Sequence, residues 1–158
     1  MVSVPVRKEV RDCLVQAENP LRECEDTGIS LAVLKYYKRM SEHKDYVEHY
    51  EDFNIYLKSG EYENTFIVFA TYKMKIKDIY TPVPGLGTLY AREAGDGGIC
   101  IESRAQDVVT QQMIAQITKH EDVRELFGQV EKAYREAVKS DAMLAEALGD
   151  LQNAALEE

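Results

Sequence analysis

The residues best suited to acid–base or metal chemistry lie close together, between a predicted helix and a predicted strand. They are His43 and His49, with the carboxylates of Asp45, Glu48 and Asp52 beside them. The histidines are six positions apart, which is neither the i, i+4 spacing of a helical ligand pair nor part of a known strand-face motif. We therefore interpret this cluster as solvated polar residues ahead of a strand, and we predict neither a metal site nor a catalytic pair.

The candidate nucleophiles have structural explanations instead. Ser103, Thr118 and Ser140 stand where helices are predicted to begin, and Cys100 lies within a predicted strand. His120 stands at a helix junction, where an exposed residue is expected. No Gly-x-Ser-x-Gly segment is present. The sequence thus predicts no catalytic residue and no cofactor.

The cysteines do not form a recognisable site. Cys13, Cys24 and Cys100 lack Cys-x-x-Cys spacing, and their odd number leaves at least one outside any disulfide. We expect ordinary thiols and no zinc site, and a bridge between Cys13 and Cys24 is the alternative.

Net charge and hydropathy exclude several classes of partner. The formal charge of -9 disfavours nucleic acid, because such binders cluster positive charge against phosphates. The one basic stripe, Lys73, Lys75 and Lys77, suits a solvated strand that resists unwanted pairing. No apolar run approaches the roughly 20 residues of a membrane span, and the first residues lack the core of a secretory signal. The localisation stays unknown from these features.

The clearest structural signal is a long strand over residues 65–77. Its even positions from Phe66 to Ile76 are all apolar or aromatic, whereas its odd positions change from Ile67 and Phe69 to lysines. One face of the sheet is therefore expected to be buried throughout and the other at one end. The other predicted strands are residues 53–58, 88–93 and 99–102, with a rigid Pro-Gly connection over 82–87 and a hairpin turn over 95–98.

Helices are predicted on both sides of these strands. The first covers Arg7 to Glu18, and the second is capped by Thr27 and carries Tyr36 and Tyr37 on its apolar face. Residues 41–52 are expected to form a short helix or turn. After the strands, capping boxes at Ser103 with Gln106 and at Thr118 with Glu121 mark two helix starts, and Ser140 or Asp141 caps a third helix.

This order predicts an α+β fold: a strongly curved antiparallel sheet of about four strands packed on N-terminal helices, with a C-terminal helical extension. The expected divisions are an N-terminal helical segment over 1–26, a core over 27–104, C-terminal helices over 105–151 and a frayed tail over 152–158.

Several segments resemble the nuclear transport factor two-like (cystatin-like) domains of Gram-positive bacterial surface or secreted proteins. They are Tyr36-Tyr37 with Met40, residues 46–60, Phe66 to Lys77, Thr81-Pro-Val-Pro-Gly-Leu-Gly-Thr-Leu-Tyr, residues 121–127 and residues 142–148. The resemblance implies a cone-shaped fold with a cavity at its wide end. It also implies an extracytoplasmic or cell-surface accessory module, and self-association through the outer face of the sheet.

Within such a cone, Tyr36, Phe69, Tyr72 and Tyr90 are the candidate ligand-pocket residues, suited to a small apolar ligand. Their alternative role, which we favour, is to fill the core. We therefore expect a non-catalytic binding or assembly module of unknown ligand, acting as a homodimer or with a protein partner. The alternatives are a small-molecule-binding or isomerase/dehydratase-like enzyme that uses the cone cavity, and a helical tail from Gln106 to Leu151 that docks a partner.

Overall fold

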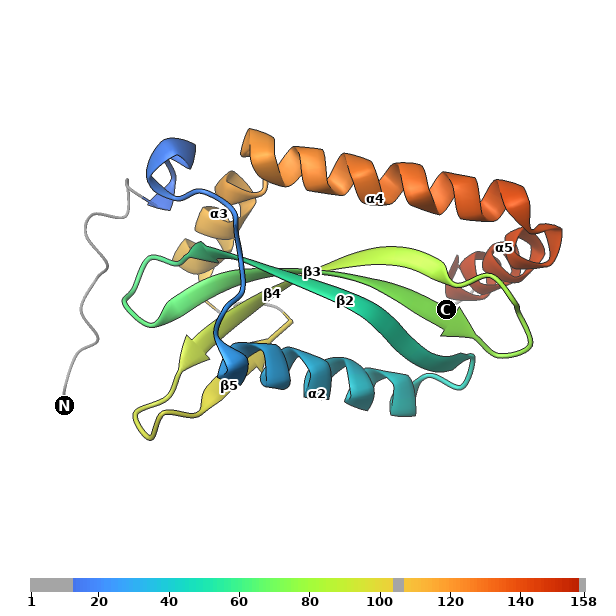
Figure 1. The fold of residues 1–158 in the computed structure, drawn as a ribbon, viewed down its shortest axis with the longest axis horizontal. Helices are drawn as coiled ribbons and strands as arrows, with labels where there is room; N and C mark the ends of the chain where they lie inside the picture. Colours follow the sequence, from blue (N-terminus) through green and yellow to red (C-terminus); the bar gives the residue numbers. More distant parts are fainter. Residues whose placement is uncertain (1–12, 104–106, 157–158) are drawn as a thin grey trace.

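The computed structural model describes residues 13–103 and 107–156. Its sheet has five antiparallel strands in the order β1-β2-β3-β4-β5, and it is open rather than closed (Figure 1). The elements are η1 (Gln16–Glu18), β1 (Arg22–Glu23), α2 (Thr27–His43), β2 (Val47–Ser59), β3 (Thr65–Ile76), β4 (Val83–Glu93), β5 (Ile99–Glu102), α3 (Val108–Ile117), α4 (Glu121–Ser140) and α5 (Ala142–Leu156).

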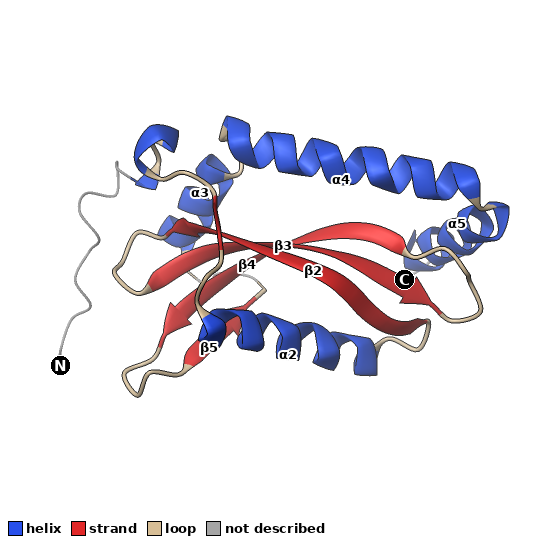
Figure 2. Ribbon diagram, in the orientation of Figure 1, coloured by secondary structure: helices blue, strands red, loops and turns tan. Residues whose placement is uncertain are grey.

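The predicted α+β class is confirmed, but the strand number and the helix placement differ. The fifth strand, β1, has only two residues, too few for any periodicity to reveal it. The helices cover both faces of the sheet, with α2 on one side and α4 on the other (Figure 2). Residues 7–12 of the first predicted helix lie outside the described residues, and η1 is the helical turn that follows.

The two faces of β3 explain this placement. Its even positions Val68 and Ala70 pack against α2, and its odd positions Ile67 and Phe69 pack under α3 and α4. All four are fully buried. The apolar end of the odd row is covered by Met113, Ile117, Val123 and Leu126.

The burial of the odd row under these helices bears on two predictions. The helices α3, α4 and α5 contribute to the core of the sheet, so they are not a detachable tail. The apolar odd row is also no longer a surface through which two sheets could associate. Self-association stays a prediction, without the surface on which it depended.

Two strands, β2 and β4, are longer than the sequence suggested. β4 begins at Val83, so the predicted Pro-Gly connection is itself strand. Glycine is required there because tyrosine rings lie against the strand: a Cβ at Gly85 would stand 2.6 Å from the Tyr72 ring, and one at Gly87 would overlap the Tyr37 hydroxyl. Similarly, α2 runs on to His43 and β2 begins at Val47, where a short helix or turn was expected.

The helix starts also differ from those predicted. Asp26, rather than Thr27, caps α2 by accepting from the Ile29 amide at 3.2 Å. Asp107 caps α3, and Gln106 of the predicted capping box lies outside the described residues. Thr118 ends α3 instead of beginning α4.

Of the three helix starts predicted after the strands, only the last is confirmed. Asp141 accepts from the Met143 and Leu144 amides at the start of α5. That helix continues to Leu156, through most of the tail predicted to fray. At the start of α4 the N-cap position belongs to His120, whose side chain makes no capping bond. The imidazole of His120 instead bonds to Lys58 and to the Leu14 carbonyl.

Candidate functional site

The four predicted pocket residues do not line one cavity. Tyr36 and Tyr72 lie on the α2 face of the sheet, whereas Phe69 and Tyr90 lie on the opposite face, under α3 and α4. The sheet itself therefore separates the two pairs. A ligand-binding role for any one of them stays a prediction.

On the α2 face, aromatic rings fill the space where the cone cavity was expected. The Tyr37 ring lies 5.3 Å from Tyr50, 5.4 Å from Phe53 and 5.0 Å from Tyr72, measured between centroids. Burial raises the pKa of Tyr37 and of Tyr72, and it raises the pKa of Tyr50 to about 12. These phenols stay protonated at neutral pH, and their rings pack against one another.

On the other face, Tyr90 belongs to a buried polar cluster that the sequence did not suggest. Its hydroxyl donates to Glu61 Oε1 at 2.8 Å, and the Thr110 hydroxyl lies 3.1 Å from the same oxygen. Glu61 is 1% exposed, and its other oxygen has no hydrogen-bond partner among the described residues. Burial and the bond to Glu61 raise the pKa of Tyr90.

The histidine and carboxylate cluster of the sequence lies on the surface. His49 pairs with Glu51 at 3.6 Å, and Asp52 pairs with Lys73 at 3.5 Å. Exposed pairs of this kind contribute roughly 0–1 kcal/mol. Within residues 13–103 and 107–156, no group of three His, Cys, Asp or Glu side chains could hold a metal ion.

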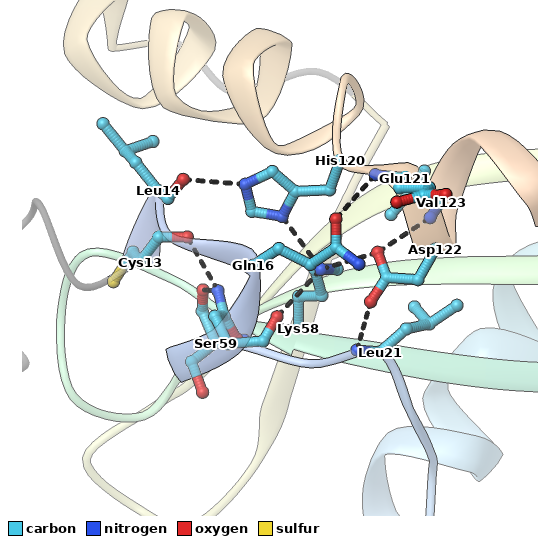
Figure 3. Close-up of polar contacts among 11 residues, drawn as sticks. Cys13, Leu14, Gln16, Leu21, Lys58, Ser59, His120, Glu121, Asp122 and Val123 are labelled. Carbon is cyan, nitrogen blue, oxygen red and sulfur yellow. Dashed lines mark hydrogen bonds and ion pairs between the residues drawn. The ribbon is translucent and has the colours of Figure 1, made fainter.

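The most highly organised polar cluster surrounds Lys58, at the end of β2 (Figure 3). This side chain is fully buried. Its ammonium lies 2.8 Å from the Asn19 carbonyl, 2.9 Å from His120 Nδ1 and 2.9 Å from Asp122 Oδ1. Three protons thus meet three acceptors, which is what makes a buried charge tolerable.

The partners of Lys58 are themselves fixed by backbone groups. Because His120 Nδ1 accepts from Lys58, its Nε2 carries the proton that is donated to the Leu14 carbonyl at 2.9 Å. Asp122 accepts from the Leu21 amide at 2.9 Å. The side-chain amide of Asn19 donates to the Cys13 carbonyl and to the Ser59 carbonyl, so it joins these two segments of the chain.

This network overturns the prediction that His120 is exposed at a helix end, since the structure leaves it 9% exposed. Burial by itself raises the pKa of Asp122, but the hydrogen bonds from Lys58 and Leu21 outweigh it and hold the pKa below its ordinary value. Burial lowers the pKa of Lys58, and the bonded Asp122 opposes that shift. The network fastens the segment from Cys13 to Leu21 to β2 and α4, and its buried lysine is not placed to meet a substrate.

Acid should weaken this network through Asp122. The bonds from Lys58 and Leu21 hold the pKa of the Asp122 carboxyl below its ordinary value, so the folded state favours the carboxylate. The stability that Asp122 contributes is therefore present above about pH 4, the ordinary pKa of an aspartate, and it is lost as pH falls through the lowered folded pKa.

Urea unfolding between about pH 5 and 2.5 tests the expectation. The variant Asp122→Asn should lose part of the acid dependence, and the control Asp52→Asn, at an exposed position, should keep it. Equal acid dependence in the two variants would contradict the assignment.

Two grooves flank one stretch of β2. The first, here named the α4 groove, has a volume of about 450 Å³ and lies between the sheet and α4. Its floor is largely polar and includes Asp52, Asn54 and Thr71, whereas Leu126 and Val130 of α4 form an apolar wall. It opens where the odd row of β3 turns from apolar to charged.

The second groove, here named the α2 groove, has a volume of about 350 Å³ and lies on the other side of the same strand. It is lined by Phe53 and Ile55 of β2, by Leu34 of α2 and by Glu23 at the end of β1. Asn54 and Tyr56 line both grooves.

The outer edge of β2 from Val47 to Asn54 has no paired strand among the described residues. β1 pairs only with Tyr56 and Leu57, where the chain passes from η1 to α2 across one end of β2 (Figure 2). A bulge with Asp52 at a φ of 54° interrupts the pairing with β3. Bulges at sheet edges re-aim side chains, and Asp52 is directed to Lys73.

Comparison with known proteins adds no relative. No family model, no curated protein and no solved structure matches the chain. The nuclear transport factor two-like resemblance therefore stays a prediction.

Across the described residues, no helix is long and apolar enough to cross a membrane, and no disulfide joins Cys13, Cys24 or Cys100.

Proposed function

We propose that this protein is a non-catalytic binding and assembly module that takes up an extended segment of a partner protein along the outer edge of β2. The observation that carries the proposal is the position of the two grooves, one on each side of residues 52–56 of the same strand. A strand added to a sheet edge directs successive side chains to opposite faces. Such a segment would place alternate side chains in the α4 groove and the α2 groove.

One backbone carbonyl at this edge already accepts a hydrogen bond from a neighbouring segment of the chain. The Cys24 amide, just beyond β1, donates to the Ile55 carbonyl at 2.8 Å. A partner strand that continues the line of β1 would use the same kind of bond. Strand addition gains affinity from main-chain hydrogen bonds and specificity from pockets for alternate side chains.

The other open edge is less suitable. Within the described part of the chain, β5 pairs with Tyr90 to Glu93 only, which leaves the first part of β4 with one partner strand. That part contains Pro84, which has no amide proton to donate, and proline on an edge strand protects it from added strands. The enzyme alternative has no matching support, because tyrosine rings fill the expected cavity on the α2 face.

Selection of a random peptide display library on the full chain tests the proposal. Peptides of about ten residues should be enriched, with dissociation constants in the micromolar range, or roughly -8 kcal/mol. Leu34 is 40% exposed and lines the α2 groove. Leu34→Trp should therefore fill that groove and weaken binding by at least about tenfold.

The matched control is Leu31→Trp, on the same helix at a residue that is 52% exposed and absent from the lining of either groove. It should bind like the wild type. Failure of the library to enrich any peptide, or equal loss of binding in both variants, would contradict the proposed function.

A further inference from the structure

From the charges around the two grooves we infer that the partner segment is basic, with Lys or Arg alternating with apolar residues. This inference rests on the proposed function and names the chemistry of the segment. Glu48, Glu51 and Asp52 lie along the open part of β2, and Glu23 lies in the α2 groove. Four carboxylates therefore border the edge.

Two of these four carboxylates already have lysine partners, which leaves Glu23 and Glu51 as the charges that a basic segment would meet. Lys73 pairs with Asp52 at 3.5 Å and Lys75 pairs with Glu48 at 3.4 Å. Lys75 also donates to the Ile76 carbonyl at 3.0 Å. Among the described residues, Glu51 has an ion pair only with His49, which is charged only if it is protonated.

The residues that line each groove indicate which kind of partner side chain that groove would take. The α2 groove joins the apolar Leu34, Phe53 and Ile55 to Glu23, which suits the aliphatic stem of a lysine or arginine with its charged end at the carboxylate. The α4 groove offers Leu126, Val130 and Ala133 on one wall, which suits a branched apolar residue. The long-range field of a chain with charge -9 favours the same partner.

The same charges disfavour a second copy as the occupant. If two β2 edges paired with each other, Glu48, Glu51 and Asp52 of one copy would face the same carboxylates of the other copy. Like charges directly opposite in a sheet are destabilising. The edge thus favours a different, cationic chain over its own copy.

Two probe peptides, identical except that one alternates Val with Lys and the other alternates Val with Glu, test the inference. Fluorescence anisotropy on the full chain at low salt should show at least about tenfold tighter binding of the Lys peptide, a difference that shrinks as salt screens the charges. The double variant Glu23→Lys with Glu51→Lys should reverse the preference. The control pair Glu136→Lys with Glu146→Lys changes the net charge equally at exposed helical positions and should keep the preference for the Lys peptide.

The outcomes separate this inference from the proposed function. Equal binding of both peptides, lost in Leu34→Trp, would retain strand addition and overturn the basic partner. Reversal by the control pair as well would assign the preference to net charge alone and overturn it too. A dimer in sedimentation that the Lys peptide dissociates would assign the edge to a second copy, and no binding of either probe or of the library would contradict the proposed function itself.

Discussion

Replacing Lys58 by Met should lower the free energy of unfolding by about 3 kcal/mol or more, the range measured when one partner of a buried ion pair is removed. The Met side chain keeps the volume of the lysine stem but leaves Asp122 and the Asn19 carbonyl without the ammonium that bonds both. Since a domain of this size is typically stable by only about 5–15 kcal/mol, the loss is a substantial fraction of the total.

The matched control is Lys73→Met, on the neighbouring strand. Its ammonium is half exposed and pairs with an exposed carboxylate, so the change should stay within about 0.5 kcal/mol. Urea unfolding followed by circular dichroism measures both. Similar values for the two variants would show that the Lys58 network does not hold the N-terminal segment as described.

Replacing Gly87 by Ala should cost about 1–3 kcal/mol, because the new methyl group would overlap the Tyr37 hydroxyl. The Tyr37 ring is held by Tyr50, Phe53 and Tyr72, so it cannot easily move away. The cost should appear as a lower unfolding midpoint in urea with an unchanged slope.

A double-mutant cycle identifies the cause. Tyr37→Phe removes the overlapping oxygen, so Gly87→Ala should cost less in that background, with a coupling of at least about 0.5 kcal/mol. As a control, Gly128→Ala in α4 places its methyl group in open space and should raise stability by roughly 0.5–1 kcal/mol. Strict additivity of the two changes would exclude the proposed overlap.

Local patterns were sufficient to predict much of the sheet. The alternation along β3 predicted one face buried throughout and the other at one end. The second feature is present, because Ile67 and Phe69 are covered while Lys73 stays exposed. On the even face no residue is exposed, but Phe66, Tyr72 and Met74 are only partly buried. The class followed from the order of helices and strands. The placement of the helices did not, since period alone cannot say which face a helix covers.

The features that were missed depend on contacts between distant residues. Lys58 is 39 residues from Asn19 and 62 from His120, so nothing near it in the sequence marks a buried charge. Asp122, two residues after His120 at a helix start, resembled an ordinary acidic first turn. Gly85 and Gly87 resembled a turn because their real constraint, the tyrosine rings of α2 and β3, lies outside the segment.

Hydrogen exchange with the Val-Lys peptide tests the central claim, that a partner segment adds to the outer edge of β2. Upon addition of peptide, amides within residues 53–55 should exchange more slowly, while those within residues 85–88 of β4 should be unchanged. Binding that protects β4, or that leaves the amides of β2 unchanged, would contradict strand addition at this edge.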